Sequence, residues 1–205
     1  MSLSLWLAFL AAAILIAISP GPGAAASMSA GVRFGYRSAL RVIFGLQAAL
    51  ITQLAIVALG LGALLIASTT AFNAIKILGA LYLVWLGIQK WRSPPPMADE
   101  TTREAAVRGL FFEGLLVNLT NPKAIVFIAA LTPQFVDPGR PQWPQFLIMA
   151  ATMCGVDTVV MSGYALLATR VRHWLNNPRA LRVQNRLFGG VFVGAGVLLA
   201  TSSRS

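Results

Sequence analysis

Six long apolar stretches divide this chain, and each is close to the length that a helix needs to cross a lipid bilayer. Their approximate limits are residues 3 to 32, 42 to 67, 71 to 89, 110 to 132, 145 to 169 and 187 to 203. About 20 apolar residues span a hydrocarbon core of about 30 Å. Only 11% of the 205 residues are charged, which leaves little for a soluble domain. We therefore predict an all-α integral membrane protein, a single transmembrane domain over residues 1–205 with six transmembrane helices.

The basic residues alternate between the two sides of this predicted bundle. Twelve of the sixteen follow spans one, three and five: Arg33, Arg37, Arg41, Lys90, Arg92, Arg103, Arg108, Arg170, Arg172, Arg179, Arg182 and Arg186. Only Arg140 and Arg204 follow the other spans, while Lys76 and Lys123 lie within spans. Loops rich in Lys and Arg stay in the cytoplasm. The net charge of +10 thus indicates topology rather than nucleic-acid binding, and both termini are expected outside.

A proline-rich connection separates two halves of the chain, residues 1–90 and 110–205. It covers residues 91–109, contains three consecutive prolines at 94–96 and continues with mixed charges. Such a composition predicts a cytoplasmic surface linker with one short helical turn.

Helix-breaking residues interrupt the first span at Ser19-Pro20-Gly21-Pro22-Gly23. An unbroken helix over residues 3 to 32 would be about 45 Å long, half as long again as the hydrocarbon core. Prolines remove backbone donors, so we expect the helix to unwind here and to leave unpaired backbone groups. A simple proline kink in a packed helix explains this span equally well. A cleavable signal peptide fits poorly, because Met1 to Leu5 contains no basic residue.

Span four is interrupted in a more polar way. Asn118, Thr120, Asn121, Pro122 and Lys123 stand together about halfway along it. A Lys at the centre of a spanning helix costs about 2.5–3.5 kcal/mol, so such residues face the bundle interior or water. The alternative, that Lys123 extends to the membrane surface, is less favourable because it lies about ten residues from either end of the span. We therefore expect this segment to line a site.

Asp157 is the other charge within a span, at a depth similar to that of Lys123. The two side chains could form an ion pair that only locks spans four and five together. In the functional interpretation Asp157 binds a substrate ammonium or a coupling proton, and Lys123 or a freed backbone amide faces a carboxylate. Tyr164 follows Asp157 at helical spacing on the same face, although such a tyrosine is often an interfacial anchor.

Four further positions are weaker candidates. Gln47 and Gln53 stand six residues apart on span two and so face different directions. Glu113 lies near the cytoplasmic end of span four, where a partly solvated carboxylate is ordinary. Gly190 and Gly194 form a small-xxx-small pair that helix packing explains.

Several classes of function lack the residues that they need. The single cysteine, Cys154, excludes an intramolecular disulfide, and the single histidine, His173, lies in a basic loop. We therefore predict no metal and no cofactor, which disfavours an intramembrane enzyme and a metal-ion exporter. An exporter of another small solute and a non-transporting sensor on the same fold stay open.

The two interrupted spans enter the membrane from opposite sides. With both termini outside, span one enters from outside and span four from the cytoplasm. Spans one to three and four to six are then inverted repeats, an arrangement typical of secondary transporters whose broken helices meet near the midplane.

At these motifs the chain resembles the LysE/RhtB family of amino-acid exporters over essentially its whole length. Pro20, Gly21 and Pro22 match the family's motif in span one, and Asn121, Pro122 and Lys123 match its motif in span four. The stretch from Asn118 through Lys123 to Pro133-Gln134-Phe135-Val136, Trp85-Leu86-Gly87-Ile88-Gln89, and Asp157 with Gly163-Tyr164-Ala165 are similar to the homoserine and homoserine lactone exporter branch.

The resemblance implies a carrier in the bacterial cytoplasmic membrane, surrounded by lipid, that exports small neutral amino acids or derivatives by proton antiport. The expected substrate-binding residues are Pro20, Gly21, Pro22, Gly23, Asn118, Asn121, Pro122, Lys123, Asp157 and Tyr164, with Asp157 also the proton-coupling residue. A homo-oligomer is compatible with this expectation. Many family members have Asn where this chain has Gly23, so a contact from that amide to substrate is absent or moved.

Overall fold

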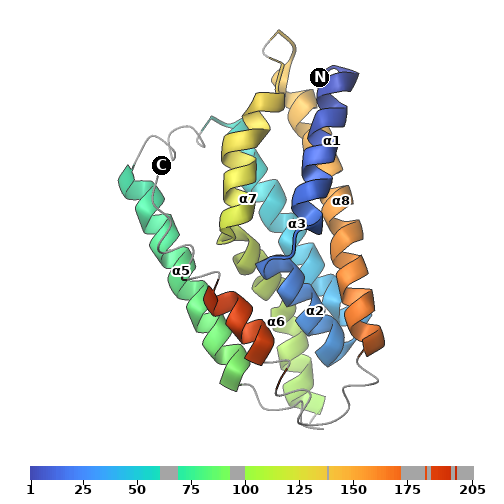
Figure 1. Cartoon of the computed structure of the whole chain (residues 1–205), viewed down its shortest axis with the longest axis vertical. Helices are drawn as coiled ribbons and strands as arrows, with labels where there is room; N and C mark the ends of the chain where they lie inside the picture. Colours follow the sequence, from blue (N-terminus) through green and yellow to red (C-terminus); the bar gives the residue numbers. More distant parts are fainter. Residues whose placement is uncertain are drawn as a thin grey trace.

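The protein forms an elongated bundle of helices whose axes run mainly along its long dimension (Figure 1). The computed structural model describes residues 1–60, 69–92, 100–137, 139–171, 183, 186–194 and 197, and it contains no β-strand among them. The helices are α1 (Leu3–Ile18), α2 (Pro22–Phe34), α3 (Tyr36–Ala58), α5 (Thr69–Arg92), α6 (Glu100–Leu119), α7 (Pro122–Val126), the π-helix η1 (Phe127–Leu131), the 3-10 helix η2 (Thr132–Phe135) and α8 (Gln142–Val171). Residues 186–194 are also helical.

Two helices are long and apolar enough to cross a membrane alone. They are α3 and residues 142–170 of α8. Two further pairs pass the same test together, α1 with α2 and residues 107–119 of α6 with residues 123–129, so the described residues hold up to four spans. The predicted third span falls on α5. Residues 61–67 of the second and much of the sixth lie outside the described residues. The prediction of a helical membrane protein is confirmed.

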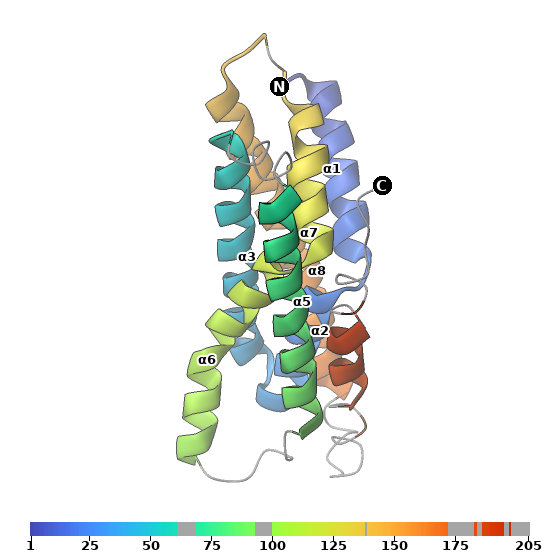
Figure 2. The ribbon, with the colours of Figure 1, turned by 90° about the vertical axis from the view of Figure 1, so that its left-hand side faces the viewer.

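Both pairs are bent at the interruptions that the sequence contains. The axes of α1 and α2 differ by 54°, and those of the second pair by 59°. Figures 1 and 2 show that α1 and α2 descend through the bundle while α6 and α7 ascend, and that both bends lie near mid-height. The two interrupted segments therefore run in opposite directions and meet in the middle of the molecule.

The connection between the halves is more helical than the sequence predicted. Helix α5 continues to Arg92 and α6 begins at Glu100, so the single short turn expected within residues 91–109 is wrong. The reason lies in residues 100–108, which contain neither Pro nor Gly and continue the helix of the fourth span outward.

The interior is built on α2, which is rich in small residues. Ten of its thirteen residues are buried, including Ala24, Ala25 and Ala26, whereas only three residues of α1 are buried. Small side chains let α2 approach α3, α6 and α8 closely. Outward-facing side chains of α1 and α8, such as Leu15 and Val159, are large, apolar and more than two-thirds exposed, as lipid contact requires. The bend thus places the α2 half inside the bundle and the α1 half nearer its surface.

Glycines let α3 and α6 touch backbone to backbone. A Cβ atom on Gly45 would overlap the Phe111 carbonyl and lie 2.7 Å from the Leu115 nitrogen, and one on Gly114 would overlap the Val42 carbonyl. The small-residue packing expected at Gly190 and Gly194 is not seen among the described residues, since neither has a described atom within 4 Å of its hypothetical Cβ. Gly189 instead faces Trp91 and the Gly87 carbonyl of α5. The spacing of glycines thus indicated a packing face in this helix, but the glycine in contact is residue 189 and not residue 190.

We expect Gly114→Ala to destabilise the bundle strongly, because the added methyl group must push α3 away from α6. Overpacking of this kind costs about 1–3 kcal/mol or more. The measurement is the thermal unfolding midpoint in detergent, followed by size-exclusion chromatography. Gly163→Ala is the matched control, since its Cβ would have no described atom within 4 Å. Equal midpoints for the two variants would contradict the close contact.

Five of the described arginines lie at one end of the bundle. The end of α2 carries Arg33, the start of α3 carries Arg37 and Arg41, and the ends of α5 and α8 carry Arg92 and Arg170. All these helix ends lie at the lower end in Figure 1, together with the start of α6. The alternation of charge along the sequence therefore becomes a separation of charge in space.

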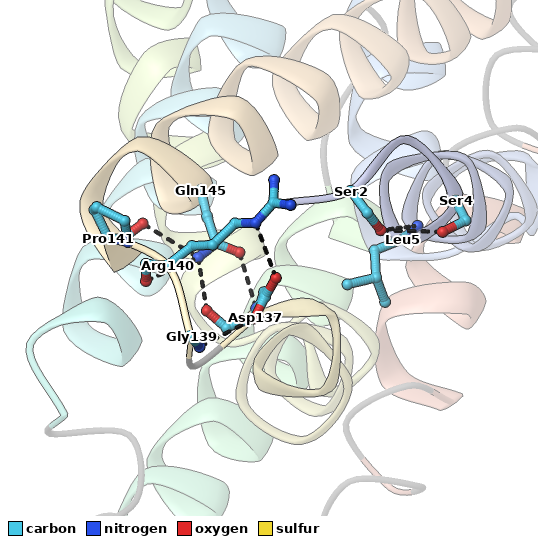
Figure 3. A network of polar contacts seen from close by, with 8 residues as sticks. All are labelled: Ser2, Ser4, Leu5, Asp137, Gly139, Arg140, Pro141 and Gln145. Carbon is cyan, nitrogen blue, oxygen red and sulfur yellow. Dashed lines mark hydrogen bonds and ion pairs between the residues drawn. The ribbon is translucent and has the colours of Figure 1, made fainter.

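The opposite end holds a compact polar loop between η2 and α8, shown in Figure 3. Arg140 there forms an ion pair with Asp137 at 3.2 Å. Gln145, which is 1% exposed, accepts from the Asp137 amide at 2.9 Å and donates to the carbonyls of Asp137, Arg140 and Pro141. The one described basic side chain at this end is thus neutralised by a neighbour, which sharpens the difference between the two ends.

Candidate functional site

The first interruption follows directly from the missing N–H groups of two prolines. In a continuous helix the N–H of residue 22 would bond to the Ile18 carbonyl, and Pro22 has none. Helix α1 therefore ends at Ile18, and α2 starts at Pro22, a favourable first position. The carbonyls of Ile18 and Ser19 lose their helical partners and need others.

The second interruption repeats this chemistry. Pro122 stands 100 residues after Pro22 and begins α7, so the Asn118 carbonyl loses its donor as the Ile18 carbonyl does. Asn121 caps α7, since its side-chain oxygen accepts from the Lys123 amide at 3.1 Å. The Thr120 hydroxyl donates to the Leu116 carbonyl at 2.8 Å and so closes the end of α6. Thr120 and Asn121, two of the polar residues that distinguish this span in the sequence, therefore form hydrogen bonds with its own backbone.

Each interruption is completed by side chains from the other half of the chain. The Tyr164 hydroxyl of α8 donates to the Ile18 carbonyl at 2.5 Å, and the Lys123 ammonium donates to the Ser19 carbonyl. Conversely, the Gln53 amide of α3 donates to the Asn118 carbonyl at 3.0 Å and approaches that of Leu119 at 3.5 Å. This reciprocal capping ties the two broken segments together.

The side chains of Asn118 and Gln47 make hydrogen bonds in the region between the two breaks. The Asn118 amide donates to the Leu46 carbonyl of α3 at 3.0 Å and accepts from the Asn121 amide at 3.3 Å. The Gln47 amide donates to Asp157 Oδ2 at 2.7 Å. Lys123 and Asp157 therefore each have a neutral partner, on Ser19 and Gln47, instead of pairing with each other.

A cavity of about 50 Å³ lies between the two breaks. Its polar wall comes from Ser19, Gly21, Asn118, Asn121, Lys123 and Asp157, and its apolar wall includes Ala13, Ile16, Leu50, Phe127, Met153 and Met161. One ammonium and one carboxylate thus share a small, mostly apolar space, where charge interactions are stronger than in water.

The cavity unites most of the candidate residues. Gly21, Gly23, Asn118, Asn121, Lys123 and Asp157 all line it. Pro20, Pro22 and Tyr164 do not; these two prolines shape the first break, and Tyr164 contacts its backbone. The side chain of Pro122 lies outside the described part of the chain. A Cβ on Gly23 would lie 3.3 Å from Leu46 Cδ2, so a larger side chain at this position would need this leucine to move.

Sequence reasoning undervalued the two glutamines of α3. Their different directions made Gln47 and Gln53 seem unimportant, yet both are buried and each serves one part of the site. The signal was their burial cost: two amides within an apolar span need polar partners, and neighbouring helices hold the two breaks and Asp157. The described residues contain no group of three or more His, Cys, Asp or Glu side chains that could hold a metal ion.

The family model for the LysE type translocator matches residues 14–203. The chain belongs to this family. Among its relatives, the "Homoserine/homoserine lactone efflux protein" of Salmonella typhimurium is 44% identical over 98% of both chains, and an "Uncharacterized membrane protein" of Vibrio cholerae is 45% identical over 98% of this chain and 99% of the relative. The "Leucine efflux protein" of Salmonella typhimurium is 32% identical over 94% of this chain and 93% of the relative.

Membership in a translocator family confirms a membrane transport protein rather than an enzyme. No solved structure matches the chain.

Proposed function

We propose that this protein exports small neutral amino acids or their derivatives, such as homoserine and homoserine lactone, from the bacterial cytoplasm by proton antiport. The observation that carries the proposal is that Asp157 and Lys123 line the same cavity, at the junction of two broken helices. Intramembrane charges of this kind mark substrate and proton paths. The names of the relatives, which describe efflux of homoserine, its lactone and leucine, support the substrate class.

The cavity suits the two ends of an amino acid. Asp157 receives the substrate ammonium or the proton that replaces it, and Lys123 receives the carboxylate or the lactone carbonyl after leaving the Ser19 carbonyl. An uncharged side chain lies against the apolar wall, where a second charge would be costly to bury. The cavity in this conformation is far smaller than the roughly 300–1,000 Å³ of most ligand pockets, so substrate binding requires the breaks to move apart.

The topology belongs to the same proposal. Spans one and four are the two bent pairs, the six spans form two inverted repeats, and the basic end faces the cytoplasm of an inner-membrane protein with both termini outside. The equivalent positions of Pro22 and Pro122, and the opposite directions of the two bent pairs, support this arrangement.

The experiment is transport by purified protein in lipid vesicles. Vesicles loaded with labelled homoserine, and separately with leucine or lysine, are diluted into a more acidic buffer, and release of label is followed. We expect proton-driven release of homoserine well above that of lysine. Release that is absent, or that ignores the pH gradient, would contradict proton-coupled export and would favour the sensor alternative or another coupling.

A further inference from the structure

The side-chain amide of Gln47 contacts the carboxyl group of Asp157 from the side that faces away from the cavity. Gln47 is 8% exposed and does not line the cavity, yet its Nε2 donates to Asp157 Oδ2 at 2.7 Å. Its other polar atom, Oε1, is buried and accepts no hydrogen bond from the residues that the structure describes. The NH₂ group of this amide therefore has a partner, and its carbonyl oxygen has none among the described residues.

A primary amide can serve both protonation states of a carboxyl group. Its NH₂ group donates to a carboxylate, and its carbonyl accepts the O–H of a carboxylic acid. A half-turn about the last side-chain bond exchanges the two atoms without moving the helix. Since a buried acceptor without a partner is unfavourable, the free Oε1 points to a second state in which it is used.

The other groups around Asp157 do not offer this exchange. Among the described residues, the titratable groups that act on it are the Lys123 ammonium of α7 and the Cys154 thiol, three residues earlier on α8. Lys123 has no acceptor atom. Helices α1 and α2 contribute only apolar and glycine residues to the cavity.

We propose that Gln47 is a positioning residue whose hydrogen bond changes with the protonation state of Asp157. Its Nε2 donates to the ionised form, and its Oε1 accepts from the protonated form. The proton arrives from outside water on an Asp157 oxygen and leaves toward the cytoplasm, while Gln47 stays neutral and only rotates. The inference rests on the proposed function, in which Asp157 carries the coupling proton.

The test compares the pH profile of homoserine export by Gln47→Met and by the wild type in the same vesicles. Methionine keeps the length of the side chain and removes both polar atoms. The ionised carboxylate loses its donor, and hydrogen bonds to charged groups are the stronger ones. We expect the midpoint of the profile to move about one unit toward higher pH, with a half-saturating homoserine concentration within about threefold of wild type.

Thr52→Val is the matched control, because Thr52 lies on the exposed side of α3 and its hydroxyl donates only to the Ala48 carbonyl of its own helix. Its midpoint should equal that of the wild type. An unmoved midpoint for Gln47→Met, or an equal loss of rate at every pH, would overturn the proposal. Wild-type protein that exports nothing would contradict the proposed function itself, which separates the two failures.

Gln47→Glu keeps the test decisive if the methionine variant does not fold. Two adjacent carboxyl groups resist ionising together, so this variant should split the pH profile into two steps. A single step at the wild-type midpoint would show that residue 47 does not follow the proton, and would overturn the proposal.

Discussion

Asp157→Asn should lower proton-driven homoserine export by about two to three orders of magnitude and abolish its dependence on pH. Asparagine has nearly the shape of aspartate and can still bond to Gln47, but it carries neither the charge nor the proton. Without a titratable carboxyl group at this position the protein cannot take up and release the coupling proton, and the cavity keeps the Lys123 ammonium without an acid. The measurement is the initial rate of label release from vesicles across a range of external pH.

Asp137→Asn is the matched control for this variant. Asp137 lies in the polar loop at the far end of the bundle, where it pairs with Arg140. The same chemical change there should leave export and its pH profile unaltered. Normal proton-driven export by Asp157→Asn would remove Asp157 from the mechanism and with it the main argument for antiport.

Lys123→Met should raise the half-saturating concentration of homoserine about ten- to a hundredfold. Hydrogen bonds to charged groups contribute about 1.5–3 kcal/mol, and this variant loses the one ammonium that the described residues contribute to the cavity lining. Homoserine lactone has no free carboxylate and should be affected less. The measurement is the concentration dependence of export for both substrates in the same vesicles.

The comparison of the two substrates separates recognition from structure. Lys123 also binds the Ser19 carbonyl, so its loss frees a backbone acceptor at the first break. An equal defect for homoserine and its lactone would assign Lys123 to that structural contact. Arg140→Gln removes a positive charge far from the cavity and should change neither concentration.

The sequence alone was informative about the breaks because their chemistry is local. Pro22 and Pro122 each remove a donor from a helix in lipid, and no packing arrangement can restore it. The charged residues followed the same logic, since Lys123 and Asp157 had to share an interior position.

The partners of these groups were harder to predict because they depend on how helices rotate against one another. Tyr164 shares a face with Asp157 but reaches the Ile18 carbonyl, because α8 passes beside the end of α1. Gln47 and Gln53 point in different directions, as their spacing indicates, yet each direction leads to a part of the site. Spacing along one helix cannot identify the surface that a neighbouring helix presents.

Reciprocal capping has a consequence for the synthesis of this protein. The Ile18 and Ser19 carbonyls are made early, but Lys123 follows Ser19 by 104 residues and Tyr164 follows Ile18 by 146. When the first helices enter the bilayer, the residues that will donate to these two carbonyls have not yet been synthesised. The first break can reach its final state only after the second half has been inserted, so maturation of the proposed site is a late event in biogenesis.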